Sequence, residues 1–208
     1  MLSRAAPPEV NPMQPFEPPI ETLDLAGTGG QIGASCEDFV VDEIPAYAWT
    51  GQGDHLMVRF RKRATNTQYA VKTIAAAAGV DARDIGVAGQ KDRWAVTTQW
   101  ISLPKSARPP ESWSLPPEIE VLETSAHQHK LRTGHLAGNR FSLRLVGVDN
   151  AAAAPALVAR LQRDGLANFF GTQRFGREGG NLDEALTWLR ADRRARGRTD
   201  RFKARLWP

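Results

Sequence analysis

The sequence predicts an α+β fold, with a mixed, largely antiparallel sheet and flanking helices. Two observations predict this class: β-like segments are interleaved with helical segments, and most β-like segments have hairpin-like neighbours along the chain. The 208 residues are enough for one substantial core, or for one domain and part of a second. The hydrophobic content of 41% and the charged content of 24% are ordinary for a soluble globular protein.

The first predicted strands follow a proline-rich start. Residues 1–19 contain six prolines and no apolar core of the secretory kind, so we expect residues 1–29 to form an extended, poorly packed leader. A short β-like run at residues 39–41 comes next and is closed by Pro45. A half-buried strand is then predicted by strict alternation, with Leu56, Val58 and Phe60 facing inward and Met57, Arg59 and Arg61 facing outward.

A helix is predicted over residues 66–78. Asn66 is a good N-cap, and Gly79 ends the helix. The side chains expected on its buried face are Tyr69, Val71, Ile74, Ala75 and Ala78.

Residues 84–89 (DIGVAG) then predict a strand, and residues 95–103 (AVTTQWISL) predict its return. Between them lies Asp92, with Lys91 before it and Arg93 after it. We therefore expect Asp92 in a strand-to-strand turn, where a rigid base can display its side chain.

The remaining elements follow from proline and capping signals. Residues 104–117 contain five prolines and predict a surface loop, and residues 119–148 predict a pair of strands joined by a basic, glycine-containing connection. A helix is expected to start near Ala154, because Pro155 is tolerated only in the first turn. Residues 181–192 open with the spacing of a capping box and predict a further helix.

Positive charge is concentrated in two parts of the chain. From residue 190 onward there are eight basic residues and two acids, so the net charge of +4 is largely an effect of this tail. Residues 124–148 contain no acid, and their basic residues are Lys130, Arg132, Arg140 and Arg144. Such a stretch suits a polyanion, because each neutralised phosphate releases counterions. It equally fits a solvated loop and strand edge, and both interpretations stay open.

Several classes of protein are disfavoured. Cys36 is the only cysteine, so no intrachain disulfide can form, which fits a reducing cytoplasm. No segment approaches the roughly 18 consecutive apolar residues of a membrane span. Although His127, His129 and His135 are close in sequence, no cysteine or carboxylate completes a ligand set, so we predict no metal site. Nothing in the sequence indicates an obligate protein partner.

Three short stretches share an unusual combination of residues. Each places a small flexible residue beside amides, an aromatic side chain and an arginine. They are residues 88–100 (AGQKDRWAVTTQW), residues 134–143 (GHLAGNRFSL) and residues 168–176 (NFFGTQRFG). Amides read base edges, aromatics stack on bases, and arginines hold phosphates. Together the three stretches predict an RNA-binding surface.

Four motifs, in this order, resemble the TruD-type tRNA pseudouridine synthases. They are EDFVVDEIP (37–45), AGQKDRWAVTTQW (88–100), HKLRTGHLAGNRFSL (129–143) and ANFFGTQRFGREGGNLDEALTWLR (167–190). The resemblance covers roughly residues 30–192 and implies a partial pseudouridine synthase catalytic domain there. Family members are longer, with an inserted second domain and a further strand of the sheet. Residues 193–208 diverge from them as a basic tail, so we expect an incomplete, C-terminally truncated member.

The resemblance implies a reaction as well. Family members convert a uridine of tRNA, usually at position 13 in bacteria, into pseudouridine without a metal or organic cofactor. They break the C1′–N1 bond, turn the base and reattach it through C5. Asp92 matches the family's essential carboxylate, acting as nucleophile or by an equivalent proton-abstracting route, and Lys91 or Arg93 would keep it ionised. The alternatives are a catalytically inactive RNA-binding remnant and a small basic protein of a ribonucleoprotein.

The resemblance also implies which residues hold the extruded uridine. Phe141 matches the aromatic that stacks on the target base, and Asn139 matches the amide that hydrogen-bonds near it. Glu37 belongs to the first motif and would order the turn that holds Asp92. The fourth motif is expected to line the same cleft with Asn168, Phe170, Gln173 and Arg174. For Phe170, packing in the core is an equally good interpretation.

Overall fold

The computed structural model describes residues 20–167. Residues 28–151 form one compact unit, and residues 20–27 with 152–167 belong to another. The expected leader over residues 1–19, the predicted helix over residues 181–192 and the basic tail lie outside the described residues. So do four predicted site residues, Asn168, Phe170, Gln173 and Arg174.

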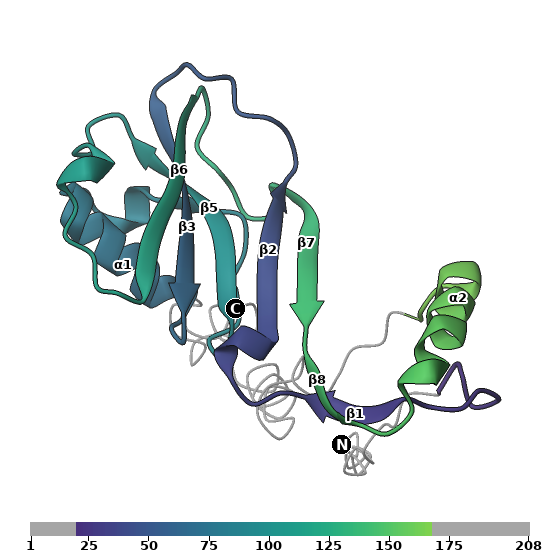
Figure 1. Cartoon of the computed structure of the whole chain (residues 1–208). Helices are drawn as coiled ribbons and strands as arrows, with labels where there is room; N and C mark the ends of the chain where they lie inside the picture. Colours follow the sequence, from purple (N-terminus) through teal and green to yellow (C-terminus); the bar gives the residue numbers. More distant parts are fainter. Residues whose placement is uncertain (1–19, 168–208) are drawn as a thin grey trace, which may run out of the picture. The chain divides into compact units, whose positions relative to one another are not determined.

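The larger unit is built around a six-stranded sheet (Figure 1). Its strands are β2 (Phe39–Pro45), β3 (His55–Arg63), β4 (Gly86–Val87), β5 (Val96–Pro104), β6 (Ile119–His127) and β7 (Leu136–Leu143). The order across the sheet is β6–β3–β5–β2–β7, and β4 also pairs with β5. In this sheet β2 and β5 are parallel and every other recorded pair is antiparallel, which confirms the predicted mixed, largely antiparallel α+β fold.

A second, two-stranded ladder adjoins the sheet. It pairs β1 (Gly29–Ile32) with β8 (Leu145–Val148), and a short 3-10 turn, η1 (Cys36–Asp38), leads from it into β2. The buried Asp38 carboxylate accepts a hydrogen bond from the Ser35 main chain and forms an ion pair with Arg144. The main-chain N–H of Arg144 donates to the Asp38 carbonyl at 2.9 Å. These contacts tie the start of β2 to the end of β7.

We expect the Asp38–Arg144 pair to make stability sensitive to acid. The hydrogen bond from Arg144 lowers the pKa of Asp38 from 3.8 to about 2. The unfolded chain therefore takes up this proton first, so the stabilisation is complete above about pH 4 and is lost as pH falls towards about 2. Urea unfolding of the wild type and of Asp38→Asn should show that the difference between their free energies of unfolding shrinks as pH falls through this range. A difference that does not change with pH would contradict this assignment.

The first helix, α1 (Thr67–Ala78), begins and ends as predicted. Asn66 Oδ1 accepts a hydrogen bond from the Tyr69 main chain at 2.7 Å, and Gly79 ends the helix with φ at 71°. The buried residues are Thr67, Ala70, Ile74, Ala75 and Ala78. The prediction was wrong for Tyr69, which is 46% exposed, and Val71 is only partly buried. Alanines at the contact allow α1 to approach the sheet closely, and this places the buried stripe around them.

The core has two clusters, one on each face of the sheet. The helix α1 packs through Ile74 on the face that carries Val58, Phe60 and Ile101, as Figure 1 shows beside β3 and β6. Met57, predicted to face outward to solvent, is fully buried instead. It belongs to the cluster on the opposite face, which also contains Ala88, Trp100 and Leu131. Side chains therefore pack on both faces of β3 at this point. Alternation of hydrophobicity along one strand does not reveal that its outward face is also buried.

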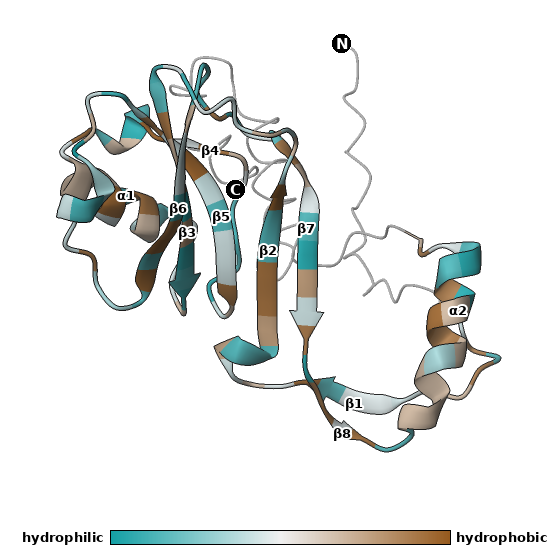
Figure 2. Ribbon diagram, turned by 45° about the horizontal axis from the view of Figure 1, so that its top comes forward, coloured by the Kyte–Doolittle hydropathy of each residue, from teal (hydrophilic) through white to brown (hydrophobic). Residues whose placement is uncertain are grey.

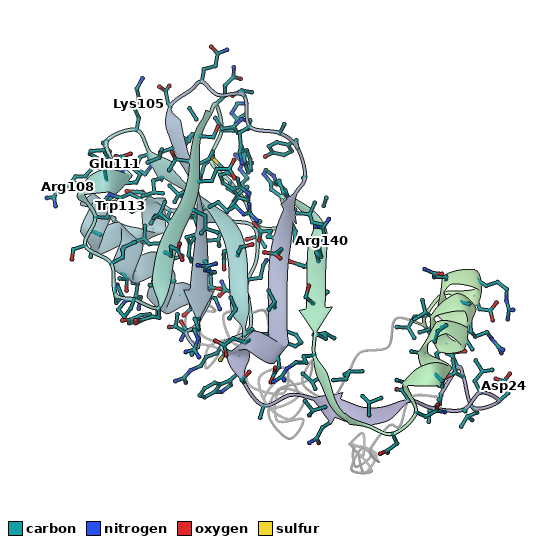
Figure 3. All side chains as sticks on the ribbon, in the orientation of Figure 1. Asp24, Lys105, Arg108, Glu111, Trp113 and Arg140 are labelled. Atoms are coloured by element: carbon teal, nitrogen blue, oxygen red, sulfur yellow. The ribbon has the colours of Figure 1, made fainter. Side chains whose placement is uncertain are left out.

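The two strands predicted within residues 119–148 exist but do not pair with each other. Strand β6 pairs with β3 at one edge of the sheet, and β7 pairs with β2 at the other edge. The chain crosses the sheet between them. The predicted loop over residues 104–117 contains only a short 3-10 turn, Pro110–Ser112. Figure 3 shows side chains of this loop on the side of the sheet away from β7, namely Lys105, Arg108, Glu111 and Trp113.

The smaller unit contains α2 (Ala154–Asp164), whose start was predicted from Pro155. Arg160 forms ion pairs with Asp24 and Asp164. Among the residues that the structure describes, none of the helices has the length and apolar character needed to cross a membrane.

Candidate active site

Asp92 lies in the loop between the antiparallel strands β4 and β5, as predicted. Its side chain is exposed, and within residues 20–167 its carboxylate has no recorded hydrogen bond or ion pair. The neighbouring Trp94 is 71% exposed, and the Arg93 guanidinium lies 5.4 Å from the centre of its ring. The loop thus presents an exposed carboxylate next to an arginine stacked on an aromatic ring.

The main chain of this loop is held by three buried polar side chains. Lys62 Nζ donates to the Asp92 carbonyl at 2.6 Å, and Gln99 Nε2 donates to the Gly89 carbonyl at 3.5 Å. The Lys91 N–H donates to Thr67 Oγ1 at 2.9 Å, and that hydroxyl donates to Gln99 Oε1 at 3.0 Å. Lys62, Thr67 and Gln99 are each at most 1% exposed. The core of the sheet and the first residue of α1 therefore fix the loop from beneath.

Lys62 is a site residue that was not predicted from the sequence. Its ammonium also donates to the Thr65 carbonyl at 2.7 Å. Burial lowers the pKa of Lys62 from 10.5 to about 8; the charge of Asp92 opposes this change, and the charge of Lys91 adds to it. The sequence could have indicated its burial, because Lys62 follows Val58 and Phe60 at every second position and thus occupies an inward position of the strand.

Glu43 was missed as well. Its Oε2 lies 2.6 Å from Lys91 Nζ, and the two side chains are only 1% and 5% exposed. Its Oε1 accepts a hydrogen bond from the Trp100 main chain at 3.0 Å. Residues 96–98 of β5 pair with β2, and residues 101 and 102 pair with β4. Trp100 lies between these two segments of β5, where neither β2 nor β4 pairs, and the Glu43 carboxylate accepts its N–H there. The same carboxylate forms the ion pair with Lys91.

Strand register places Phe141 and Asn139 on the same face as Lys62. One row of directly opposed residues runs through Phe141, Val41, Thr97 and Lys62, on β7, β2, β5 and β3. Asn139 lies in the adjacent row, opposite Glu43. Side chains of directly opposed residues lie on the same face of a sheet. Phe141 is 56% exposed and makes an edge contact with Phe39 at 6.1 Å, so much of its ring is open to a ligand.

Within the described residues, the partner of Glu37 lies at the end of β3 and not in the Asp92 loop. Its carboxylate forms an ion pair with Arg63, whose hydrogen bond lowers the pKa of Glu37. Arg63 and Arg93 line a hollow of about 410 Å³ together with Tyr69 and Glu118. This hollow borders the Asp92 loop.

Another hollow, of about 530 Å³, lies on the opposite face of the sheet. Its lining includes Asp42, Arg59, Glu123 and Arg140. Arg140 alternates with Asn139 and Phe141 along β7 and thus faces away from them. Figure 3 labels Arg140 on β7. In Figure 2 the colour of β2 changes from hydrophobic near η1 to hydrophilic further along, where the polar side chains of both faces begin.

The basic residues of the stretch 124–148 are not gathered at one place. Arg144 pairs with Asp38, and Lys130 Nζ donates to the Arg83 carbonyl at 3.0 Å. His127 is buried against Tyr47 and Trp49, with ring centres 5.4 Å apart in both pairs. No group of three or more potential metal ligands occurs among the residues described.

Known proteins are similar to this chain in sequence and in fold. Residues 20–184 match the family model described as tRNA pseudouridine synthase D (TruD). The protein of that name from Anaeromyxobacter sp. (strain Fw109-5) is 48% identical over 192 residues, which cover 90% of this chain and 54% of that protein. The one from Vibrio parahaemolyticus is 44% identical over 175 residues, covering 82% and 50% respectively.

A solved structure with a similar fold belongs to a protein of the same description. The crystal structure of a TruD protein from Methanosarcina mazei has a TM-score of 0.67 and 29% identity to this chain, covering 80% of this chain and 40% of that one. The chain spans about half the length of the curated relatives it matches. On the match over residues 20–184, the chain belongs to the TruD family of tRNA pseudouridine synthases.

Proposed function

We propose that this chain isomerises a uridine of tRNA to pseudouridine, with Asp92 as the catalytic carboxylate. The observation that carries the proposal is the exposed Asp92 carboxylate on a loop fixed by Lys62, Thr67 and Gln99. Membership of the TruD family supports tRNA as the substrate class. The uridine at position 13 is the target that the resemblance of the four motifs implies. Because tRNA is the substrate, we place the reaction in the cytoplasm.

The reaction needs one carboxylate and a way to retain the base. The C1′–N1 bond breaks, the uracil turns in the site, and a C1′–C5 bond forms; C5 loses a proton and N1 gains one. Asp92 either attacks the sugar or abstracts a proton on an equivalent route. Ordinary glycoside hydrolysis uses a second carboxyl group, which is not required when the leaving base stays bound.

The uridine must leave its stack to reach Asp92. In this proposal Phe141 stacks on the extruded base and Asn139 hydrogen-bonds near it, because both lie on the face that the Asp92 loop covers. Arg93 holds the RNA backbone beside the loop, where the hollow of about 410 Å³ lies.

The test measures the proton that leaves C5. Purified chain is mixed with tRNA that carries tritium at C5 of uridine, and tritium release is followed at low salt. We expect release from tRNA with uridine at position 13 and none from tRNA with cytidine there. RNA binding without tritium release would refute the enzyme and favour the non-catalytic RNA-binding alternative.

Replacing Phe141 with alanine should weaken productive uridine binding by about 1–3 kcal/mol, the usual range for a base stacked on an aromatic ring. The single-turnover rate measured against chain concentration gives this change directly. Leu143→Ala is a matched control, since Leu143 is an apolar side chain of the same strand, 48% exposed. Equal, small effects of the two variants would mean that Phe141 only packs against Phe39.

A further inference from the structure

The Lys62 ammonium is fully buried, and no carboxylate of residues 20–167 is bonded to it. Its recorded hydrogen-bond partners within the described residues are two main-chain carbonyls, those of Asp92 and Thr65. Burying a charge without an opposite charge in contact costs stability, and a methionine would fill a similar space without that cost. The fold alone therefore gives little reason for a lysine here.

The other two cations of the loop, Lys91 and Arg93, contact other side chains. Lys91 Nζ is engaged by Glu43 at 2.6 Å, and the Arg93 guanidinium stacks on Trp94. Lys62 is the cation that contacts the main chain of Asp92 itself. The groups whose charges act on Lys62 are Asp92 and Lys91 in the loop and Cys36 in η1.

We propose that Lys62 is a positioning residue of the active site, whose buried ammonium clamps the Asp92 main chain and so holds the Asp92 carboxylate in place under bound RNA. The inference rests on the proposed function. A charged donor makes a stronger hydrogen bond to a carbonyl than a neutral donor does, so the ammonium holds the loop more firmly than an amine would. RNA cannot displace this cation because the sheet buries it.

The charge of Lys62 should be lost in a measurable pH range. Because burial lowers the pKa of Lys62 to about 8, the ammonium is present below that pH and is lost above it. The neutral amine makes weaker hydrogen bonds to both carbonyls, so deprotonation should loosen the clamp. A pH profile can thus separate a clamp made by the charged ammonium from simple packing of the side chain.

The activity test compares Lys62→Met with Lys72→Met, which removes an exposed lysine of α1. We expect Lys62→Met to lower the single-turnover rate about 10²-fold, the cost of a misplaced catalytic group, while RNA affinity changes little. The wild-type rate should fall as pH rises through about 8, and the Lys72→Met rate should follow it. The proposal would be overturned if Lys62→Met kept the full rate, or if its pH profile were the same as that of the wild type.

A second measurement does not depend on activity. The ¹³Cε resonance of Lys62, assigned by its loss in Lys62→Met, should titrate near pH 8, and the variant should speed amide exchange in residues 89–93 but not in α1. A titration near the ordinary value of 10.5, or unchanged exchange in the loop, would overturn the proposal. If the wild-type chain forms no pseudouridine, the proposed function fails, and these spectra still decide whether Lys62 holds a charge beneath the loop.

Discussion

Asp92→Asn should abolish pseudouridine formation while leaving RNA affinity within a few-fold. The amide keeps the shape of the side chain and removes its charge, and the carbonyl that Lys62 binds belongs to the main chain. We expect the rate to fall by at least about 10⁴-fold, the scale seen when an essential catalytic group is removed. Single-turnover tritium release and filter binding of the same tRNA measure the two quantities.

Asp84→Asn is the matched control for charge. It removes one exposed acid from the nearby 3-10 turn Ala82–Asp84 and should leave the rate unchanged. Retained turnover in Asp92→Asn would refute the catalytic role of Asp92. A loss of thermal stability in Asp92→Asn, absent from Asp84→Asn, would instead show that the carboxylate has a structural role.

The largest effect on stability is expected at Glu43. Glu43→Ala leaves the Lys91 ammonium buried without its partner and the Trp100 N–H without its acceptor. Removing one member of a buried pair typically costs about 3–5 kcal/mol. Chemical denaturation should report this loss in the free energy of unfolding. Asp54→Asn, which breaks an exposed ion pair with Lys105, should cost no more than about 1 kcal/mol.

A double-mutant cycle tests the cause. Glu43→Gln with Lys91→Met removes both charges, so the double variant should be more stable than the sum of the two single losses predicts. Additive losses would show that the two side chains do not interact energetically. If the pair also orients the loop, the double variant should recover stability without recovering turnover.

Local patterns predicted the elements that hold the site. Alternation along residues 56–60 gave β3, and Asn66 with Gly79 gave the bounds of α1. The position of Asp92 between two antiparallel strands also followed from the sequence. These features depend on neighbours along the chain, and hydrophobic period and capping report on such neighbours directly.

Long-range features could not be predicted in this way. The placement of β6 and β7 at opposite edges depends on which partners the other strands offer, so adjacency in sequence did not reveal it. Lys62 and Glu43 are charged residues at inward positions, and only the fold shows what they contact there. Charge in the motif led to Lys91 and Arg93 as the cations for Asp92, whereas Lys91 faces Glu43.

The way the loop is held has a consequence for how such proteins can diverge. Lys62, Thr67 and Gln99 bind main-chain atoms of the loop, which are present whatever side chains it carries. Gln90, Arg93 and Trp94 make none of these contacts. Under the proposed function, we expect mutation at these three positions to alter which RNA is preferred without moving the carboxylate. Selection could then act on substrate choice and on chemistry almost independently within one short loop.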